Sequence, residues 1–328
     1  MKILVTGGAG YVGSHAVRLL TREGHRVWVY DNLSKGHAAA VTGLPLIVGN
    51  LNDRERLTNV LRDNQIDAVM HFAAFALVGE SVTDPELYYE NNVVGSLRLL
   101  QAVREAGVRK IVFSSTTATY GEPEKSPIAE TTPQQPINPY GFSKLAVERM
   151  LDDFSAAYGI GFAALRYFNA SGASADSMIG EDHRPESHLI PIVLQVALGQ
   201  REQITVFGND YPTPDGTCIR DYIHVDDLAT AHLKALTKIE PGRGLKLNLG
   251  SGVGYSVQQV IESCREITGH PIPAVSGPRR PGDPPALVAD SSLAQRTLDW
   301  QCCYSDLRTI VASAWNWHRS HPQGYSGA

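Results

Sequence analysis

Short apolar runs alternate with amphipathic helical patterns through the first half of the chain. The apolar runs are Ile3–Thr6, Arg26–Tyr30, Pro45–Val48, Ala68–Phe72, Lys110–Ser114 and Gly161–Leu165, and the helical patterns are Val12–Glu23, Arg54–Asn64, Pro85–Ala106 and Tyr140–Tyr158. Regular alternation of strands and helices implies right-handed crossovers and a parallel sheet covered on both faces. The pattern therefore predicts an α/β fold, with a doubly wound parallel sheet over residues 1–170.

The pattern changes after Asn169, where loops rich in glycine and proline become frequent, for example over 209–216 and 276–283. Such loops usually lie on the surface and often carry ligand contacts. The apolar run Leu245–Leu249 has the character of a strand, and we expect the segment near 245–251 to return to the main sheet. We predict a smaller C-terminal α/β lobe over residues 171–328 that binds the substrate.

Composition and charge exclude several classes of protein. The chain has 328 residues, of which 43% are apolar and 19% charged, and a net charge of −5 argues against nonspecific binding to nucleic acid or to anionic membranes. Because a strand is predicted from Met1 onward, we expect no signal peptide, and no apolar run reaches the roughly 20 residues that span a bilayer. The cysteines (Cys218, Cys264, Cys302 and Cys303) lack metal-type spacing. We expect a cytoplasmic protein without a structural metal.

A glycine-rich turn follows the first strand directly, in Thr6-Gly-Gly-Ala-Gly-Tyr-Val-Gly13. The spacing of Gly7, Gly10 and Gly13 allows a tight turn and close approach of the backbone to a pyrophosphate at a helix N-terminus. Asp31 ends the second strand, where a carboxylate can hold the adenosine 2′-hydroxyl and repel a 2′-phosphate. These features predict a Rossmann-type domain that binds NAD rather than NADP.

Tyr140 and Lys144 are spaced four residues apart on a predicted helix, so both side chains should share one face. A lysine charge about 5 Å from the phenol, at an effective dielectric constant of roughly 20, is worth about 3 kcal/mol. That energy corresponds to between two and three pKa units, enough to make the phenolate available near neutral pH. The spacing alone is also frequent by chance, so the prediction depends on the adjoining nucleotide site.

The glycine turn, Tyr140-x-x-x-Lys144 and Phe113-Ser-Ser-Thr116 resemble the extended short-chain dehydrogenase/reductases. More specific segments along nearly the whole chain resemble UDP-glucose 4-epimerases: His71-Phe-Ala-Ala, Val78-Gly-Glu-Ser81, Tyr89-Glu-Asn-Asn-Val93, Arg166-Tyr-Phe-Asn169, Phe207-Gly-Asn-Asp-Tyr-Pro-Thr213, Arg220-Asp-Tyr-Ile-His-Val225 and His321-Pro-Gln-Gly-Tyr325. The resemblance implies an isomerase that inverts C4 of a UDP-hexose through a transient 4-keto sugar, with tightly bound NAD returning the hydride it takes.

The resemblance assigns catalytic roles to three side chains. Tyr140 would be the acid and base at the sugar 4-hydroxyl, Lys144 would hold the nicotinamide ribose, and Thr116 would hydrogen-bond the substrate oxygen. The implied cofactor contacts are Gly7, Gly10, Tyr11, Val12, Gly13, Asp31, Asn32, Asn50, Leu51, Phe72, Ala73, Ala74, Asn91, Tyr140, Lys144 and Phe168. The implied substrate contacts are Thr116, Asn169, His188, Leu189, Phe207, Arg220, Arg280, Asp283 and Leu287, with the two arginines clamping the diphosphate and Asp283 holding the uridine ribose.

Four positions depart from the commonest pattern of that family. Asn50 stands where an aspartate often contacts adenine, Ala76 replaces a lysine near the cofactor, and His188 replaces an asparagine beside the diphosphate. Leu287 replaces a tyrosine that limits sugar size in some epimerases. A preference for a UDP-N-acetylhexosamine or a UDP-pentose therefore stays open beside UDP-glucose and UDP-galactose.

Other functions fit the same residues less well. A 4,6-dehydratase would need an Asp-Glu pair after the hydroxyl residue, whereas this chain has Thr116-Thr-Ala-Thr-Tyr120. A dehydrogenase that releases its cofactor would not need the epimerase-like C-terminal lobe, and a non-catalytic dinucleotide sensor commonly lacks the catalytic tyrosine or lysine. The helices over Pro85–Ala106 and near Met150–Tyr158 often pair two subunits in this superfamily, so we expect a homodimer.

Overall fold

The computed structural model describes residues 1–280 and 283–325, so the last three residues of the lobe expected over 171–328 lie outside it. Its centre is a seven-stranded parallel sheet in the order β10-β6-β5-β4-β1-β2-β3. The strands are β1 (Lys2–Thr6), β2 (Arg26–Asp31), β3 (Leu46–Val48), β4 (Ala68–His71), β5 (Lys110–Thr116), β6 (Gly161–Tyr167) and β10 (Gly244–Leu249). The predicted doubly wound sheet is confirmed, and β10 lies at its edge beside β6.

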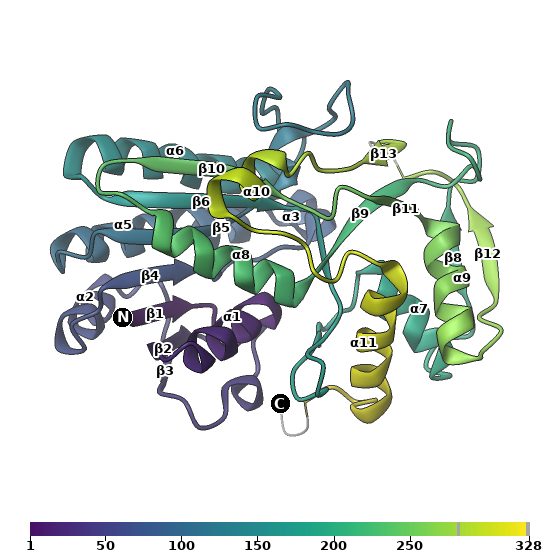
Figure 1. Ribbon diagram of the computed structural model, residues 1–328, viewed down its shortest axis with the longest axis horizontal. Coiled ribbons are helices and arrows are strands. Elements are labelled where there is room, and N and C mark those ends of the chain that lie inside the picture. Colours follow the sequence, from purple (N-terminus) through teal and green to yellow (C-terminus); the bar gives the residue numbers. More distant parts are fainter. Residues whose placement is uncertain (281–282, 326–328) are drawn as a thin grey trace.

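Helices cover both faces of this sheet (Figure 1). One face packs against α1 (Tyr11–Arg22), α8 (Val225–Lys238) and α10 (Ser292–Leu298), and the other against α2 (Arg54–Asp63), α5 (Gly95–Glu105) and α6 (Pro139–Tyr158). The bounds of α6 follow from local chemistry. Asn138 accepts a hydrogen bond from the Gly141 amide, Pro139 occupies the first turn, and Gly159 ends the helix with a positive φ of 69°.

The helix expected over Pro85–Ala106 is interrupted. A short α4 (Pro85–Tyr88) continues into a π-helical turn, η2 (Tyr89–Val94), before α5 begins. Within this turn the buried Asn92 side chain accepts from the Phe75 amide at 2.9 Å, donates to the Phe75 carbonyl at 3.0 Å and donates to the Ser143 hydroxyl at 3.1 Å. These tertiary hydrogen bonds select the π turn, which fastens the loop after β4 to the start of α6.

The rest of the chain forms a smaller α/β layer beside the carboxyl ends of the main strands (Figure 1). One small sheet contains β7 (Asn169–Ser171), β9 (Ile219–His224), β11 (Gly254–Ser256) and β13 (Ala286–Leu287), and another pairs β8 (Ile204–Phe207) with β12 (Ala274–Gly277). Their apolar core includes residues of α7 (Leu189–Ala197), α9 (Val257–Thr268) and α11 (Leu307–Ser320). Across the described residues, every helix is too short or too polar to cross a lipid bilayer.

Candidate active site

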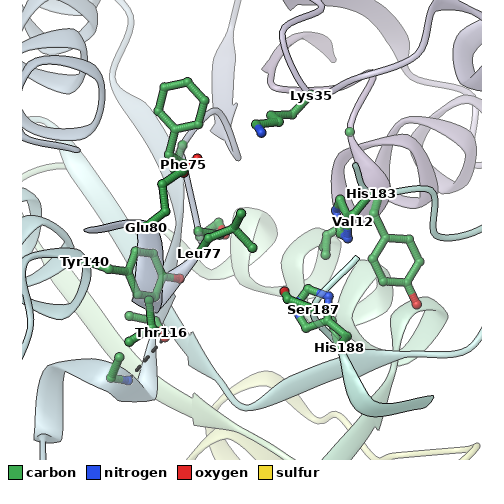
Figure 2. Close-up of a pocket in the computed structure, with 18 of the residues that line it drawn as sticks. Val12, Lys35, Phe75, Leu77, Glu80, Thr116, Tyr140, His183, Ser187 and His188 are labelled. Carbon is green, nitrogen blue, oxygen red and sulfur yellow. Dashed lines mark hydrogen bonds between the residues drawn. The ribbon is translucent and has the colours of Figure 1, made fainter. Parts of the chain in front are cut away.

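One large cavity, about 1340 Å³ in volume, opens at the carboxyl ends of the parallel strands. Its lining combines residues that follow β1, β2, β4, β5 and β6 with residues from the smaller lobe. Figure 2 shows Tyr140 and Thr116 on one side of this space and Val12, His183, Ser187 and His188 on the other. Clefts at this edge of doubly wound sheets are the usual ligand sites of such folds.

The glycine-rich turn forms a cradle that larger residues would fill. A Cβ at Gly7, whose φ is +70°, would lie 2.4 Å from the Ala73 amide nitrogen, and one at Gly13 would lie 2.1 Å from the Gly7 carbonyl oxygen. Gly10 is the N-cap of α1 and has no side chain to accept from the first-turn amides. These amides therefore face the cavity as donors for an anion, which fits the pyrophosphate of a dinucleotide.

Asp31 is fixed at the end of β2 by the same turn. One carboxylate oxygen accepts from the Ala9 amide at 3.0 Å and the other from the Leu33 amide at 2.9 Å. Burial raises the pKa of this carboxyl, against the opposing effect of those amide donors. Each oxygen retains a further lone pair, so the side chain can still accept from ribose hydroxyls in the cavity.

Lys144 is held at the cavity lining by α6 and β5. Its Nζ donates to the Ser114 carbonyl at 2.8 Å and lies 5.0 Å from the centre of the Phe113 ring. Only 3% of the residue is exposed. Burial lowers the pKa of Lys144 to about 7, because the charged ammonium loses its hydration.

Tyr140 lies one helical turn before Lys144 and lines the same cavity. Burial raises the pKa of its phenol above the ordinary value, and a hydrogen bond with the Thr116 hydroxyl opposes this rise. The lysine-driven lowering of the Tyr140 pKa expected from the sequence is therefore wrong for the protein without cofactor. The sequence argument located the pair correctly but omitted the desolvation of both groups.

The opposite end of the cavity carries charged side chains from the smaller lobe. The Arg220 guanidinium forms an ion pair with the Asp283 carboxylate, and the Arg280 guanidinium lies 4.2 Å from the centre of the Phe207 ring. Leu287 pairs in register with Arg220 between β13 and β9, which places it on the wall of the cavity. Arg220 and Asp283 thus contact each other directly, an arrangement that the sequence did not predict.

The structure brings most of the predicted site residues to this one cavity, with three exceptions. Asn50 is exposed outside the lining, and its amide oxygen accepts from the Asn52 amide at 2.9 Å. Leu189 packs against the core of the smaller lobe, and Phe207 lies beneath Arg280. The residues that line the cavity as predicted are Gly7, Gly10, Tyr11, Val12, Gly13, Asp31, Asn32, Leu51, Phe72, Ala73, Ala74, Asn91, Thr116, Tyr140, Lys144, Phe168, Asn169, His188, Arg220, Arg280, Asp283 and Leu287.

Sequence reasoning missed several charged residues in the lining, among them Lys35, Glu80, Glu181, His183 and Glu186. The last three share one loop with His188, and the sequence signal was the density of histidine and glutamate within Glu181–His188. The carboxylates of Glu181 and Glu186 raise the pKa of His188 to about 10, against the effect of burial.

Comparisons with known proteins agree with this geometry. Residues 3–250 match the model of the NAD dependent epimerase/dehydratase family. The chain belongs to this family. It is 56% identical to a UDP-glucose 4-epimerase of Halalkalibacterium halodurans, over 99% of this chain and 98% of the relative. A UDP-glucose 4-epimerase of Brucella ovis, solved with NAD, has a TM-score of 0.93 and 49% identity over 96% of this chain and 97% of that one. The Bifidobacterium longum enzyme, solved with NAD+ and UDP, has a TM-score of 0.94 and 40% identity over 99% and 100%.

Proposed function

We propose that this family member catalyses the NAD-dependent interconversion of UDP-glucose and UDP-galactose at C4. The observation that carries the proposal is the placement of Tyr140 and Thr116 across one cavity from the Arg220 and Asp283 pair, beside a cradle that fits a dinucleotide. The printed names of full-length relatives at high identity support the same reaction and favour UDP-glucose over the N-acetylhexosamine and pentose alternatives.

The proton path would run through two hydroxyl side chains. The Tyr140 phenolate would accept the proton of the sugar 4-hydroxyl and return it after the ring has turned over, while the Thr116 hydroxyl holds the same oxygen. NAD, when bound, supplies a hydride acceptor and donor, and Lys144 would hold its ribose. No net oxidation occurs, so the cofactor would stay bound through the cycle.

Inversion at C4 requires the nucleotide to be held while the hexose turns. Arg220 and Arg280 would bind the diphosphate and Asp283 the uridine ribose, with guanidinium groups suited to paired phosphate oxygens. The ion pair with Asp283 helps to orient the Arg220 guanidinium toward this end of the cavity. Leu287 leaves more room near the sugar than a tyrosine would.

The test compares the wild-type enzyme with Tyr140→Phe on UDP-galactose, UDP-N-acetylgalactosamine and UDP-xylose in one coupled assay. Wild-type enzyme should convert UDP-galactose fastest, and Tyr140→Phe should lose roughly 10²–10⁴-fold in turnover, the usual worth of an acid–base group. Retained NAD, measured by absorbance after denaturation, would show that the variant still binds cofactor. Tyr304→Phe, at an exposed tyrosine outside the cavity lining, is the matched control. No conversion of UDP-galactose by the wild type would refute the proposal.

The protein would act in the cytoplasm as a homodimer, with the surface of η2 and α6 as the subunit contact. This surface exposes aromatic side chains, since Tyr89 is 39% exposed and Phe142 51%, and their rings pack edge to face. A paired surface would cover these rings in a second subunit. Light scattering at micromolar concentration should give twice the mass of one chain. The Phe142→Glu variant should have a measured mass closer to that of a single chain.

A further inference from the structure

His183 and His188 lie on the wall of the cavity across from Tyr140 (Figure 2), and two glutamates that line the same cavity complete a group of four side chains able to ligate a metal. The group consists of Glu181, His183, Glu186 and His188, and its donor atoms all lie within 4.8 Å of one another. We propose that these residues bind one divalent transition-metal ion, of which Zn²⁺ fits best. The proposed reaction does not require an ion at this site, and the metal proposal rests on the donor geometry, although His188 is also an implied substrate contact.

The separations of the donor atoms are close to those of a tetrahedral zinc site. Glu181 Oε1 lies 3.0 Å from His183 Nδ1 and 2.7 Å from His188 Nδ1, and Glu186 Oε1 lies 3.3 Å from His188 Nδ1. An ion with bonds of about 2.0–2.2 Å to each donor separates neighbouring donors by about 3.3–3.5 Å. These three pairs need to move apart by less than about 1 Å, and the remaining pairs, all within 4.8 Å, to close by up to about 1.5 Å to hold the ion. Two imidazoles with carboxylates are typical zinc ligands.

Hydrogen bonding alone does not explain the cluster. His188 Nδ1 is buried and lies near two carboxylate oxygens, yet it lacks a correctly aligned hydrogen-bond partner among the described residues. His188 is also the N-cap residue of α7, but its ring does not cap that helix. The Glu181 and Glu186 carboxylates are each only 4% exposed, and a bound cation would interact favourably with both of them.

The surrounding structure holds the ligands in place, as outer contacts do in metal sites. The Glu181 carbonyl accepts from Trp317 Nε1 at 3.1 Å, and this indole is fully buried. Glu186 Oε1 accepts from the backbone amides of Ser187 and His188 at 2.7 and 2.8 Å. The His183 ring packs edge to face on Tyr11 at 6.1 Å between centroids, so an ion would fix this loop against the start of α1.

The test uses the holoenzyme without an affinity tag. All variants carry Cys303→Ser, because the exposed thiol of Cys303 could itself bind metal. After treatment with a chelator and dialysis, Zn²⁺ is titrated by calorimetry and bound metal is counted by mass spectrometry. We expect one ion per chain. His183→Gln and Glu186→Gln should each weaken Zn²⁺ binding by at least about tenfold, since even outer-shell partners of ligands are worth that much. His270→Gln, at an exposed histidine outside the cluster, should bind like the wild type.

Cobalt gives a second measurement that does not depend on any variant. Co²⁺ bound in the cluster should show the intense visible absorption of a tetrahedral site, and Zn²⁺ should displace it. The alternative is that both histidines are protonated and pair with the glutamates without any metal. In that case the wild type would bind no more metal than His183→Gln. That result, or the weak spectrum of hexahydrated Co²⁺ in the wild type, would overturn the proposal.

Discussion

Replacing Arg166 by methionine should destabilise the protein strongly, because it breaks a buried ion pair below the active site. Arg166 is 2% exposed and Glu148 is fully buried. The guanidinium donates to both oxygens of the Glu148 carboxylate at 2.9 and 2.5 Å and to the Tyr120 hydroxyl at 2.7 Å. The Ser115 hydroxyl also donates to Glu148, at 2.6 Å. Without Arg166, a buried carboxylate keeps only its weaker neutral partners.

The expected loss is about 3–5 kcal/mol, the usual cost of removing one partner of a buried pair. With a urea slope of about 3 kcal/mol/M, the unfolding midpoint should fall by roughly 1–1.7 M. Turnover should fall as well, because Glu148 lies one turn after Lys144 on α6 and Ser115 precedes Thr116 on β5. The ion pair therefore helps to set the position of α6 relative to β5.

Urea unfolding followed by fluorescence, at one fixed NAD concentration, measures the effect. The exposed Arg149–Asp153 pair on the same helix gives the control, and Arg149→Gln should change stability by less than about 1 kcal/mol. The double variant Glu148→Leu with Arg166→Met should recover much of the loss, since it removes both charges. The reasoning is refuted if Arg166→Met unfolds within about 1 kcal/mol of the wild type, or if the double variant is less stable than the single one.

Two further predictions concern the cofactor end of the site. Gly13→Ala should abolish copurification of NAD, because the new Cβ would lie 2.1 Å from the Gly7 carbonyl oxygen, and absorbance of the denatured protein gives the NAD content. Lys144 has its pKa lowered to about 7 by burial, whereas in the unfolded chain it titrates near ~10.4. Between about pH 7 and 9 the unfolded state therefore binds more protons, and the stability of the cofactor-free protein should rise with pH. Lys144→Met should show a flatter pH dependence of the urea midpoint; equal slopes would contradict the burial argument.

The sequence predicted those parts of the fold that depend on local pattern. The strands of the main sheet and the turn at Gly7 follow from apolar periodicity and glycine spacing, and both are properties of contiguous residues. The break in the helix over Pro85–Ala106 depends instead on Asn92 reaching Phe75 and Ser143, which lie far away along the chain. No local pattern could indicate such a contact.

The site residues likewise divide into those that local pattern could predict and those that depend on contacts between distant segments. Residues that follow parallel strands, such as Asp31 and Thr116, could be placed together because carboxyl ends of such strands meet at one edge. The Glu181–His188 loop was assigned only one cavity residue, His188, since its approach to Tyr11 depends on how the smaller lobe packs. Asn50 lies outside the lining between Gly49 and Leu51, which both line the cavity, and its amide oxygen accepts a local hydrogen bond from Asn52; its cofactor contact stays a prediction.

The electrostatics of Tyr140 and Lys144 connect cofactor binding to base strength. Burial favours the neutral forms of both side chains, so the protein alone avoids an uncompensated charge at the cavity lining. A unit positive charge about 5 Å from a phenol, at an effective dielectric constant of roughly 20, lowers its pKa by two to three units. Tyr140 would therefore become an effective base only when a positive charge arrives beside it, and oxidised nicotinamide carries such a charge. The same burial that raises the pKa of the phenol in the protein alone makes it responsive to that charge, because neighbouring charges interact more strongly where water is excluded.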